Sequence, residues 1–76
     1  MMQLKVRQLR VFEAVATSAS FSRAAEQLEM TQPAVSMAVR QIEQALGTAL
    51  FDPADRRRPS DAGQGLLMHA RLNLAQ

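Results

Sequence analysis

The sequence lacks cysteine altogether, and its 76 residues include only three glycines, three prolines and one histidine. Without cysteine the protein has no disulfide framework, no thiolate metal cluster and no cysteine nucleophile, which suits a reducing cytoplasm. The single histidine, His69, cannot form a metal site by itself. No apolar run approaches the roughly 18 residues that a membrane span requires, and polar residues interrupt the N-terminus where a signal peptide would be apolar. We therefore predict a soluble cytoplasmic protein with no metal, no cofactor and no membrane partner.

Catalytic signatures are missing as well. Ser60 and Asp61 have no nucleophile-elbow context, His69 fits a surface position on the last helix, and there is no glycine-rich phosphate loop. A chain of this length buries only about 60% of the surface that its unfolded form exposes, which leaves little room for a catalytic cleft. The sequence predicts that the protein is not an enzyme.

Positive charge is in small excess, with nine Lys and Arg against seven Asp and Glu and a formal net charge of +2. This excess is too small to establish nucleic-acid binding, so the positions of the charges matter more than their sum. Lys5, Arg7 and Arg10 lie near the start, and Arg56–Arg58 form a run. Each group fits either a nucleic-acid contact or an ordinary solvated surface.

Apolar residues recur at helical spacing through the first 46 residues, which contain no glycine. The spacing predicts helices over residues 6–17, 21–29 and 32–46. Ser20 and Thr31 suit the N-caps of the second and third helices, Pro33 suits a first helical turn, and Gly47 suits a left-handed helix end. The predicted core-facing stripe of the third helix consists of Val35, Val39, Ile42 and Leu46.

The second half of the chain begins with different signals. Leu50-Phe51 predicts a short buried strand end, residues 52–55 a turn, and residues 56–59 an exposed basic arm. Ser60 suits the N-cap of a last helix, in which Gly63 and Gly65 each cost about 1 kcal/mol relative to alanine. This helix should therefore depend on a packing partner. Its apolar side is predicted to consist of Leu66, Leu67, Ala70 and Leu74.

A short helix, a turn and a longer helix form the helix-turn-helix arrangement, which needs a small residue on the first helix, an apolar residue in the turn and a β-branched residue on the second. Ala25, Met30 and Val35 meet these needs in that order. If the apolar stripe of the third helix faces the core, its opposite side presents Gln32, Pro33, Ser36, Met37 and Arg40.

This face suits the major groove of DNA. Gln32 can pair with adenine, Ser36 can bond to several bases, and Pro33 or Met37 can pack on thymine methyl groups. The alternative is an ordinary solvated helix face. The arm Arg56–Arg58 follows where a wing would lie, and it can contact phosphates or a narrow minor groove. Its alternative is a flexible basic loop.

Six motifs occur in order along nearly the whole chain, and together they resemble the N-terminal domain of LysR-type transcriptional regulators. They are Leu9-Arg10-Val11-Phe12, residues 20–28 (SFSRAAEQL), residues 31–36 (TQPAVS), Ile42-Glu43 to Leu46-Gly47, Leu50-Phe51 and Ser60-Asp61-Ala62-Gly63. The resemblance implies a mainly α fold. A winged helix-turn-helix domain with a three-helix core and a small β wing would cover residues 1–59. A linker helix, the start of which lies within residues 60–76, would pair two subunits through Leu66, Leu67, Ala70 and Leu74.

Site residues also follow from the resemblance. The base-reading positions correspond to Gln32, Pro33 and Ser36, and the neighbouring contacts to Ser22, Arg23, Thr31 and Arg40. Two features depart from the family pattern. Met37 stands where the family often has arginine, and Arg58-Pro59 stands where a strand usually leads into the linker helix.

The resemblance also bears on the extent of the chain. Full-length family members continue into a larger effector-sensing domain, and Gln76 falls inside the expected linker helix. The chain is therefore expected to be an excised DNA-binding domain or a natural truncation. Any small-molecule effector would bind in the missing domain, and the full-length protein could form a tetramer.

These observations predict sequence-specific binding of double-stranded DNA for regulation of transcription, by a homodimer on an interrupted inverted repeat. The expected location is the bacterial cytoplasm, in association with the nucleoid. The alternative from another class is a winged-helix module that mediates protein interaction or oligomerisation and does not bind DNA.

Overall fold

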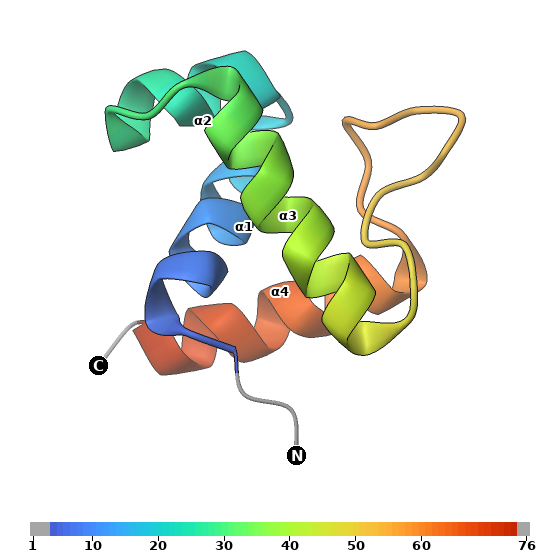
Figure 1. Cartoon of the computed structure of the whole chain (residues 1–76). Helices are drawn as coiled ribbons and strands as arrows, with labels where there is room; N and C mark the ends of the chain where they lie inside the picture. The colour runs from blue at the N-terminus through green and yellow to red at the C-terminus, as the bar shows by residue number, and fades with distance from the viewer. Residues whose placement is uncertain (1–3, 75–76) are drawn as a thin grey trace.

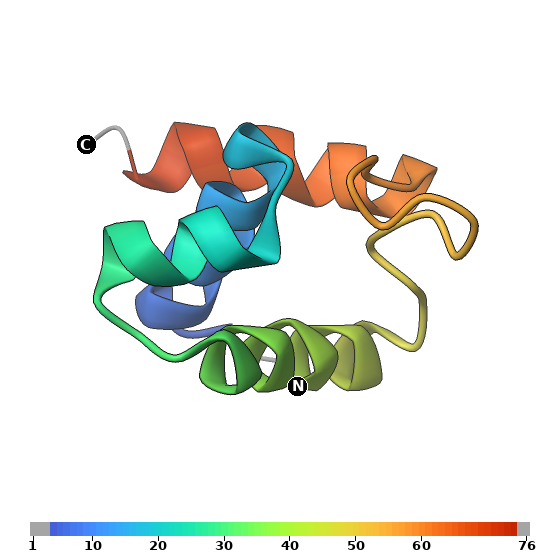
Figure 2. The same ribbon diagram turned by 90° about the horizontal axis from the view of Figure 1, so that it is seen from above.

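A computed structural model describes residues 4–74 of the chain and shows four helices. They are α1 (Val6–Ser18), α2 (Phe21–Leu28), α3 (Gln32–Leu46) and α4 (Asp61–Leu74). Helix α1 packs against each of the other three helices. Helices α3 and α4 lie on opposite sides of the molecule, with α1 and α2 between them (Figure 1, Figure 2). The prediction of a mainly α fold with a three-helix core and a following helix is confirmed.

Side-chain caps set the starts of three helices, as predicted. The hydroxyls of Ser20 and Thr31 each accept a hydrogen bond from the backbone N–H three residues on, at 3.0 and 3.2 Å. The Ser60 hydroxyl does the same for α4 at 3.1 Å. Helix α3 ends at Gly47, which has a positive φ of 70°. Helix α2 ends one residue earlier than predicted, because Glu29 has already turned into the left-handed conformation with φ 56°.

The core lies between the helices and the segment that follows α3. Phe51 is central to it, with its ring centroid 5.5 Å from those of both Phe12 and Phe21. The predicted stripe of α3 is confirmed in three positions, because Val35, Val39 and Ile42 are fully buried. The prediction that Leu46 faces the core is wrong, because its side chain is 36% exposed. It lies at the end of α3 among the exposed residues 44–49, so this end of the helix lies outside the core.

The predicted β wing is reduced to a single bridge. Phe51 and Pro59 form one isolated antiparallel β-bridge, and no strand is present within residues 4–74. The loop is closed by two backbone bonds, from Asp52 N–H to Arg58 O and from Ser60 N–H to Leu50 O, each 2.9 Å. The ladder does not extend further, because the N–H groups that would continue it are bonded elsewhere: Leu50 N–H donates to the Glu43 carboxylate at 2.9 Å and Arg58 N–H to Asp55 O at 3.0 Å.

Helix α4 packs its inner side against this chain's own core. Ala70, which the sequence assigned to a dimer interface, is fully buried within the single chain and has no exposed surface to offer a second subunit. Leu66 and Leu67, also assigned there, are half-buried against the core. The large apolar side chains that α4 exposes are Met68 and Leu72, each 68% exposed. The predicted apolar side of α4 did not include these two residues, because both faces of the helix carry apolar residues and the periodicity does not distinguish them.

The end of the predicted linker helix, including Gln76, lies outside the described residues. Among residues 4–74, no helix combines the length and the apolar character needed to cross a bilayer.

Candidate nucleic-acid interface

The five predicted reading residues lie on the outer face of α3. Gln32, Pro33, Met37 and Arg40 are exposed and Ser36 is half-buried. Their orientation follows from the burial of the opposite side of the helix in the core. Met37 is 62% exposed, which is unusual for a large apolar side chain. The structure therefore presents hydrogen-bonding and apolar groups together on the first three turns of one exposed helix.

The turn before α3 has the packing that a helix-turn-helix requires. Ala25 is 5% exposed and Val35 is fully buried, so α2 and α3 approach closely at these two positions. Met30 packs against the core from the turn, and its backbone N–H donates to Ala25 O at 2.9 Å. The roles predicted for all three residues are confirmed. This packing fixes the angle at which α3 projects.

A hydrogen bond joins α2 to the predicted reading face, the outer face of α3 that carries the five predicted reading residues. The Ser22 hydroxyl donates to Gln32 Oε1 at 3.0 Å, between exposed side chains. The bond holds the amide oxygen toward α2 and directs the amide NH₂ away from it. An amide oxygen has two lone pairs, so Gln32 can still accept from the adenine amino group while its NH₂ donates to adenine N7. Ser22 thus orients Gln32, a role that sequence spacing did not reveal.

The basic arm is held in place by two contacts. The Arg56 guanidinium lies 5.3 Å from the ring centroid of Phe21, within the range of a cation–π interaction. Arg56 also lines a groove beside α3 together with Gln32, Ser36 and Arg40. Arg57 instead pairs with Asp55, whereas Arg58 is exposed. Of the three arginines, Arg56 is therefore the one that the fold places next to the reading face.

Three acids near the arm have structural roles. Asp55 pairs with Arg57, whereas the Asp52 carboxylate accepts from Ala54 N–H at 2.8 Å and so tightens the turn. Glu43 lines the same groove as Arg56, and its carboxylate accepts from Leu50 N–H at 2.9 Å. Glu43 was not expected near the site, because its partner lies on a segment that only tertiary folding brings close.

The ion pair of the arm predicts a measurable titration. Hydrogen bonds from the Arg57 side chain and backbone N–H, each 3.1 Å, hold the pKa of Asp55 below its ordinary value of 3.8. The stabilisation from a depressed carboxyl pKa is present above the ordinary value and is lost as the pH falls through the folded-state pKa. For an exposed pair it is small. In carbon NMR titrations we expect the Asp55 midpoint to lie below 3.8 and to rise in Arg57→Ala. An unchanged midpoint in the variant would show that the pair does not form in solution.

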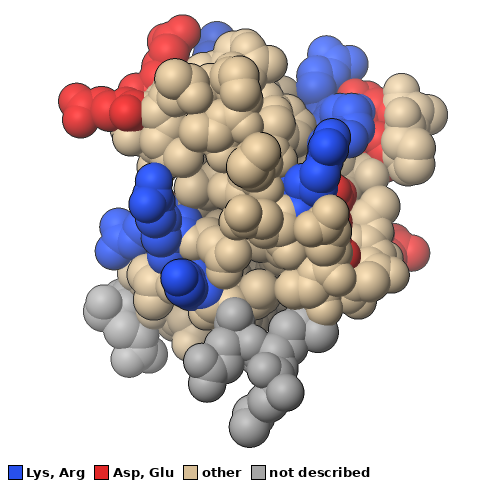
Figure 3. Space-filling view, viewed as in Figure 1, with Lys and Arg blue, Asp and Glu red and all other residues tan. Residues whose placement is uncertain are grey.

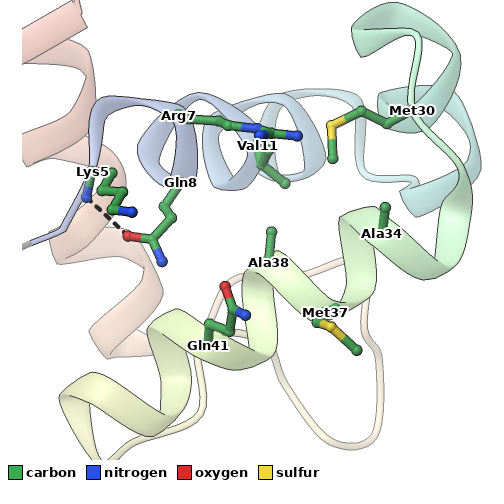
Figure 4. Close-up of a pocket in the computed structure, with 9 residues that line it drawn as sticks. All are labelled: Lys5, Arg7, Gln8, Val11, Met30, Ala34, Met37, Ala38 and Gln41. Carbon is green, nitrogen blue, oxygen red and sulfur yellow. Dashed lines mark hydrogen bonds between the residues drawn. The ribbon is translucent and has the colours of Figure 1, made fainter.

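Lysine and arginine side chains lie on both sides of α3 (Figure 3). One group lies over the loop after α3 (Figure 3), where Arg56 and Arg40 line the groove beside α3. The other lies over the start of α1, where Lys5 and Arg7 form one wall of a groove (Figure 4). Met37 and Gln41 of α3 are on the other wall. Helix α3 is thus flanked by a basic group on each side.

Helix α4 lies on the opposite side of the molecule from α3 (Figure 2), and its outer face carries a separate apolar surface. Leu67, Met68 and Leu72 line a shallow depression there with Gln64 and Arg71. His69 is exposed on α4 and does not line this depression, in agreement with its predicted surface position. Within residues 4–74, no group of three or more acidic or histidine side chains is placed to hold a metal ion.

Comparisons with known proteins give one consistent result. The family model described as "Bacterial regulatory helix-turn-helix protein, lysR family" matches residues 6–64. The RuBisCO operon transcriptional regulator of Allochromatium vinosum is 59% identical over 51 residues, which is 67% of this chain and 17% of that protein. The HTH-type transcriptional regulator CfxR of Cupriavidus necator is 50% identical over 68 residues, 88% of this chain and 22% of that protein.

A solved structure with the same fold contains DNA. The crystal structure of the BenM_DBD/benA site 1 DNA complex superimposes with a TM-score of 0.89 at 30% identity, over 95% of this chain and 82% of that chain. The present chain spans about a fifth of the length of the two regulators to which it is similar.

Proposed function

Because the chain belongs to the LysR family of bacterial regulatory helix-turn-helix proteins, we propose that it binds double-stranded DNA sequence-specifically to regulate transcription. The observation that carries the proposal is the exposed face of α3, which presents base-reading side chains between two basic groups. An α-helix fits the major groove, where each base pair displays a distinct pattern of donors and acceptors. The family is one of regulators, so we assign no catalytic reaction.

The reading contacts divide by chemistry. Gln32 and Ser36 supply hydrogen bonds to base edges, and Pro33 and Met37 supply apolar contact with thymine methyl groups. Arg40, on the next turn, reaches a base edge or a phosphate. With Met37 in place of an arginine, this face carries less charge and depends more on thymine contacts.

The backbone contacts come from the helix starts and the arm. Ser22, Arg23 and Thr31 lie at the N-terminal ends of α2 and α3, where free N–H groups and the helix dipole favour phosphate. The arm Arg56–Arg58 contacts phosphates or enters a narrow minor groove. Of the three arginines, Arg56 is the main contact, because the Phe21 ring already holds it beside α3.

We propose that the functional unit is a homodimer formed through the outer face of α4. Met68 and Leu72 are its central contacts, with Leu67 and Leu74 beside them, and Leu66 and Ala70 serve the chain's own core. A two-fold axis through paired α4 helices would place two α3 helices in successive major grooves about 34 Å apart. The operator is then an interrupted inverted repeat.

The setting of the domain follows from the same proposal. A DNA-binding regulator acts in the bacterial cytoplasm, at the nucleoid. In a full-length regulator a further domain would bind the small-molecule effector and could extend the dimer to a tetramer. The name of the A. vinosum relative makes the promoter of a RuBisCO operon the first natural DNA to test.

The salt dependence of DNA affinity separates this function from protein docking. Neutralising phosphates with Lys and Arg releases counterions, so affinity falls steeply as salt rises. We expect fluorescence anisotropy with DNA fragments selected from a random library to show much weaker binding at 200 mM than at 50 mM salt. A protein-interaction module would show no salt-dependent DNA affinity, and that result would exclude the proposal.

Gln32→Ala tests the base-reading role of α3. Loss of the bidentate contact should weaken the free energy of binding to the selected operator by about 1 to 3 kcal/mol and relax the preference at one base pair. Binding to random DNA should change little. Gln44→Ala is the matched control, because Gln44 is an exposed glutamine near the end of the same helix. Anisotropy titrations on both DNAs measure the effect. Equal losses on operator and random DNA would show that Gln32 does not read a base.

A further inference from the structure

A groove runs between the start of α1 and α3. Lys5 and Arg7 are on its α1 wall, and Ala34, Met37 and Gln41 are on its α3 wall. Figure 4 shows Arg7 extended along α1 and Lys5 at the beginning of the helix. Because Met37 belongs to both the reading face and this groove, the basic side chains border the surface proposed to enter the major groove.

The start of α1 is held in a defined position. The Gln8 side chain turns back and accepts a hydrogen bond from Lys5 N–H at 2.9 Å (Figure 4). This bond satisfies one of the free N–H groups at the helix start. Behind it, Leu9 and Val11 are buried in or against the core. Lys5 and Arg7 therefore project from an anchored helix.

The positive charge of this wall is not neutralised by nearby acids. Lys5 and Arg7 are exposed, and the ion pair present within residues 4–74 is the one between Arg57 and Asp55. The residues that line the groove include no Asp or Glu. The groove on the other side of α3 differs, because there Glu43 lies with Arg40 and Arg56. The α1 side is thus the flank with unopposed positive charge.

We propose that Lys5 and Arg7 bind DNA phosphates on the strand opposite to the one that the Arg56 arm contacts. A helix in the major groove lies between two phosphate backbones, one on each side of its axis. Lys5 and Arg7 stand on one side of α3 and Arg56 on the other, so each basic group faces a different strand. This inference rests on the proposed function, and it assigns the α1 group to the same interface. Lys5 and Arg7 would strengthen DNA binding and fix the alignment of the domain on the duplex, but they would not select a base sequence.

Neutral phosphates placed on one strand at a time test the assignment. Methylphosphonate linkages are introduced beside the major groove of both half-sites, either on the strand that faces α1 or on the strand that faces the arm. We expect each substitution to weaken the wild-type domain about tenfold, the size of one charge-assisted contact. The DNA affinity of Arg7→Ala should no longer respond to methylphosphonates on the α1-facing strand but should still respond to those on the arm-facing strand. Arg56→Ala should show the reverse. The Arg7→Ala variant should also flatten the slope of log affinity against log salt by about 0.9.

Arg10→Ala is the matched control, since Arg10 is an exposed arginine one turn further along α1 that does not line the groove. It should keep both strand sensitivities. If Arg7→Ala responds to the modified strands as the wild type does, or if Arg10→Ala matches Arg7→Ala, the inference is wrong while DNA binding by α3 stands. If the wild-type domain binds no DNA, both the inference and the proposed function fail.

Discussion

Gly63→Ala is expected to destabilise the domain strongly. A Cβ at this position would lie 2.0 Å from Leu50 O and 3.2 Å from Pro59 Cβ. Leu50 O cannot withdraw easily, because it also accepts the Ser60 N–H bond that closes the arm, and Leu50 is fully buried. Overpacking costs about 1 to 3 kcal/mol where side chains can adjust, and a backbone oxygen adjusts less. We expect a loss of about 3 kcal/mol or more in the free energy of unfolding, measured by urea denaturation.

That loss is comparable with the whole stability of a domain of this size, because a single small core rarely supplies more than about 3 to 5 kcal/mol. Gly65→Ala is the matched control, two residues further along the same helix. A Cβ there would meet nothing within 4 Å, so the variant should gain up to about 1 kcal/mol from improved helix propensity. Similar shifts of the urea midpoint in the two variants would contradict the close approach of α4 to Leu50.

The double variant Met68→Glu/Leu72→Glu is expected to convert the proposed dimer to a monomer. Each side chain is 68% exposed in the single chain, and together they form the centre of the outer face of α4. In a symmetric dimer, four new carboxylates would face one another without partners, and burying unpaired charge is strongly unfavourable. Sedimentation should show half the wild-type mass. Affinity for the two-half-site operator should fall by about 10² or more, because linked sites no longer bind together.

His69→Glu serves as the control for this experiment. His69 is exposed on the same helix but does not line the depression, so an added carboxylate there should leave the mass unchanged. The fold should survive in both variants, because none of the three residues is buried. A double variant that keeps the wild-type mass would show that α4 does not pair two subunits through this face.

Much of the fold was predictable from the sequence because its determinants are local. The caps at Ser20, Thr31 and Ser60 and the helix end at Gly47 depend on residues within one turn of each other. The exposed face of α3 could be predicted for the same reason, since burial of a periodic stripe leaves the opposite side of a helix exposed.

The features that were missed depend on contacts between distant segments. In α4, an apolar pattern cannot tell which of two faces meets the core, so the buried Ala70 was assigned to the exposed side of the helix and the exposed Met68 was not. The requirement for Gly63 comes from a backbone oxygen far away in sequence. The position of Arg56 over Phe21 likewise depends on tertiary folding, so it could not be predicted from local sequence spacing.

The ratio of operator affinity to random-DNA affinity tests the central claim most directly. The wild-type domain is titrated by fluorescence anisotropy, at one salt concentration, against its selected operator and a scrambled duplex of the same length. If α3 reads bases in a dimer, the operator should bind at least about 10³-fold more tightly, as specific DNA-binding proteins do. Equal affinity for the two duplexes would contradict sequence-specific reading by α3.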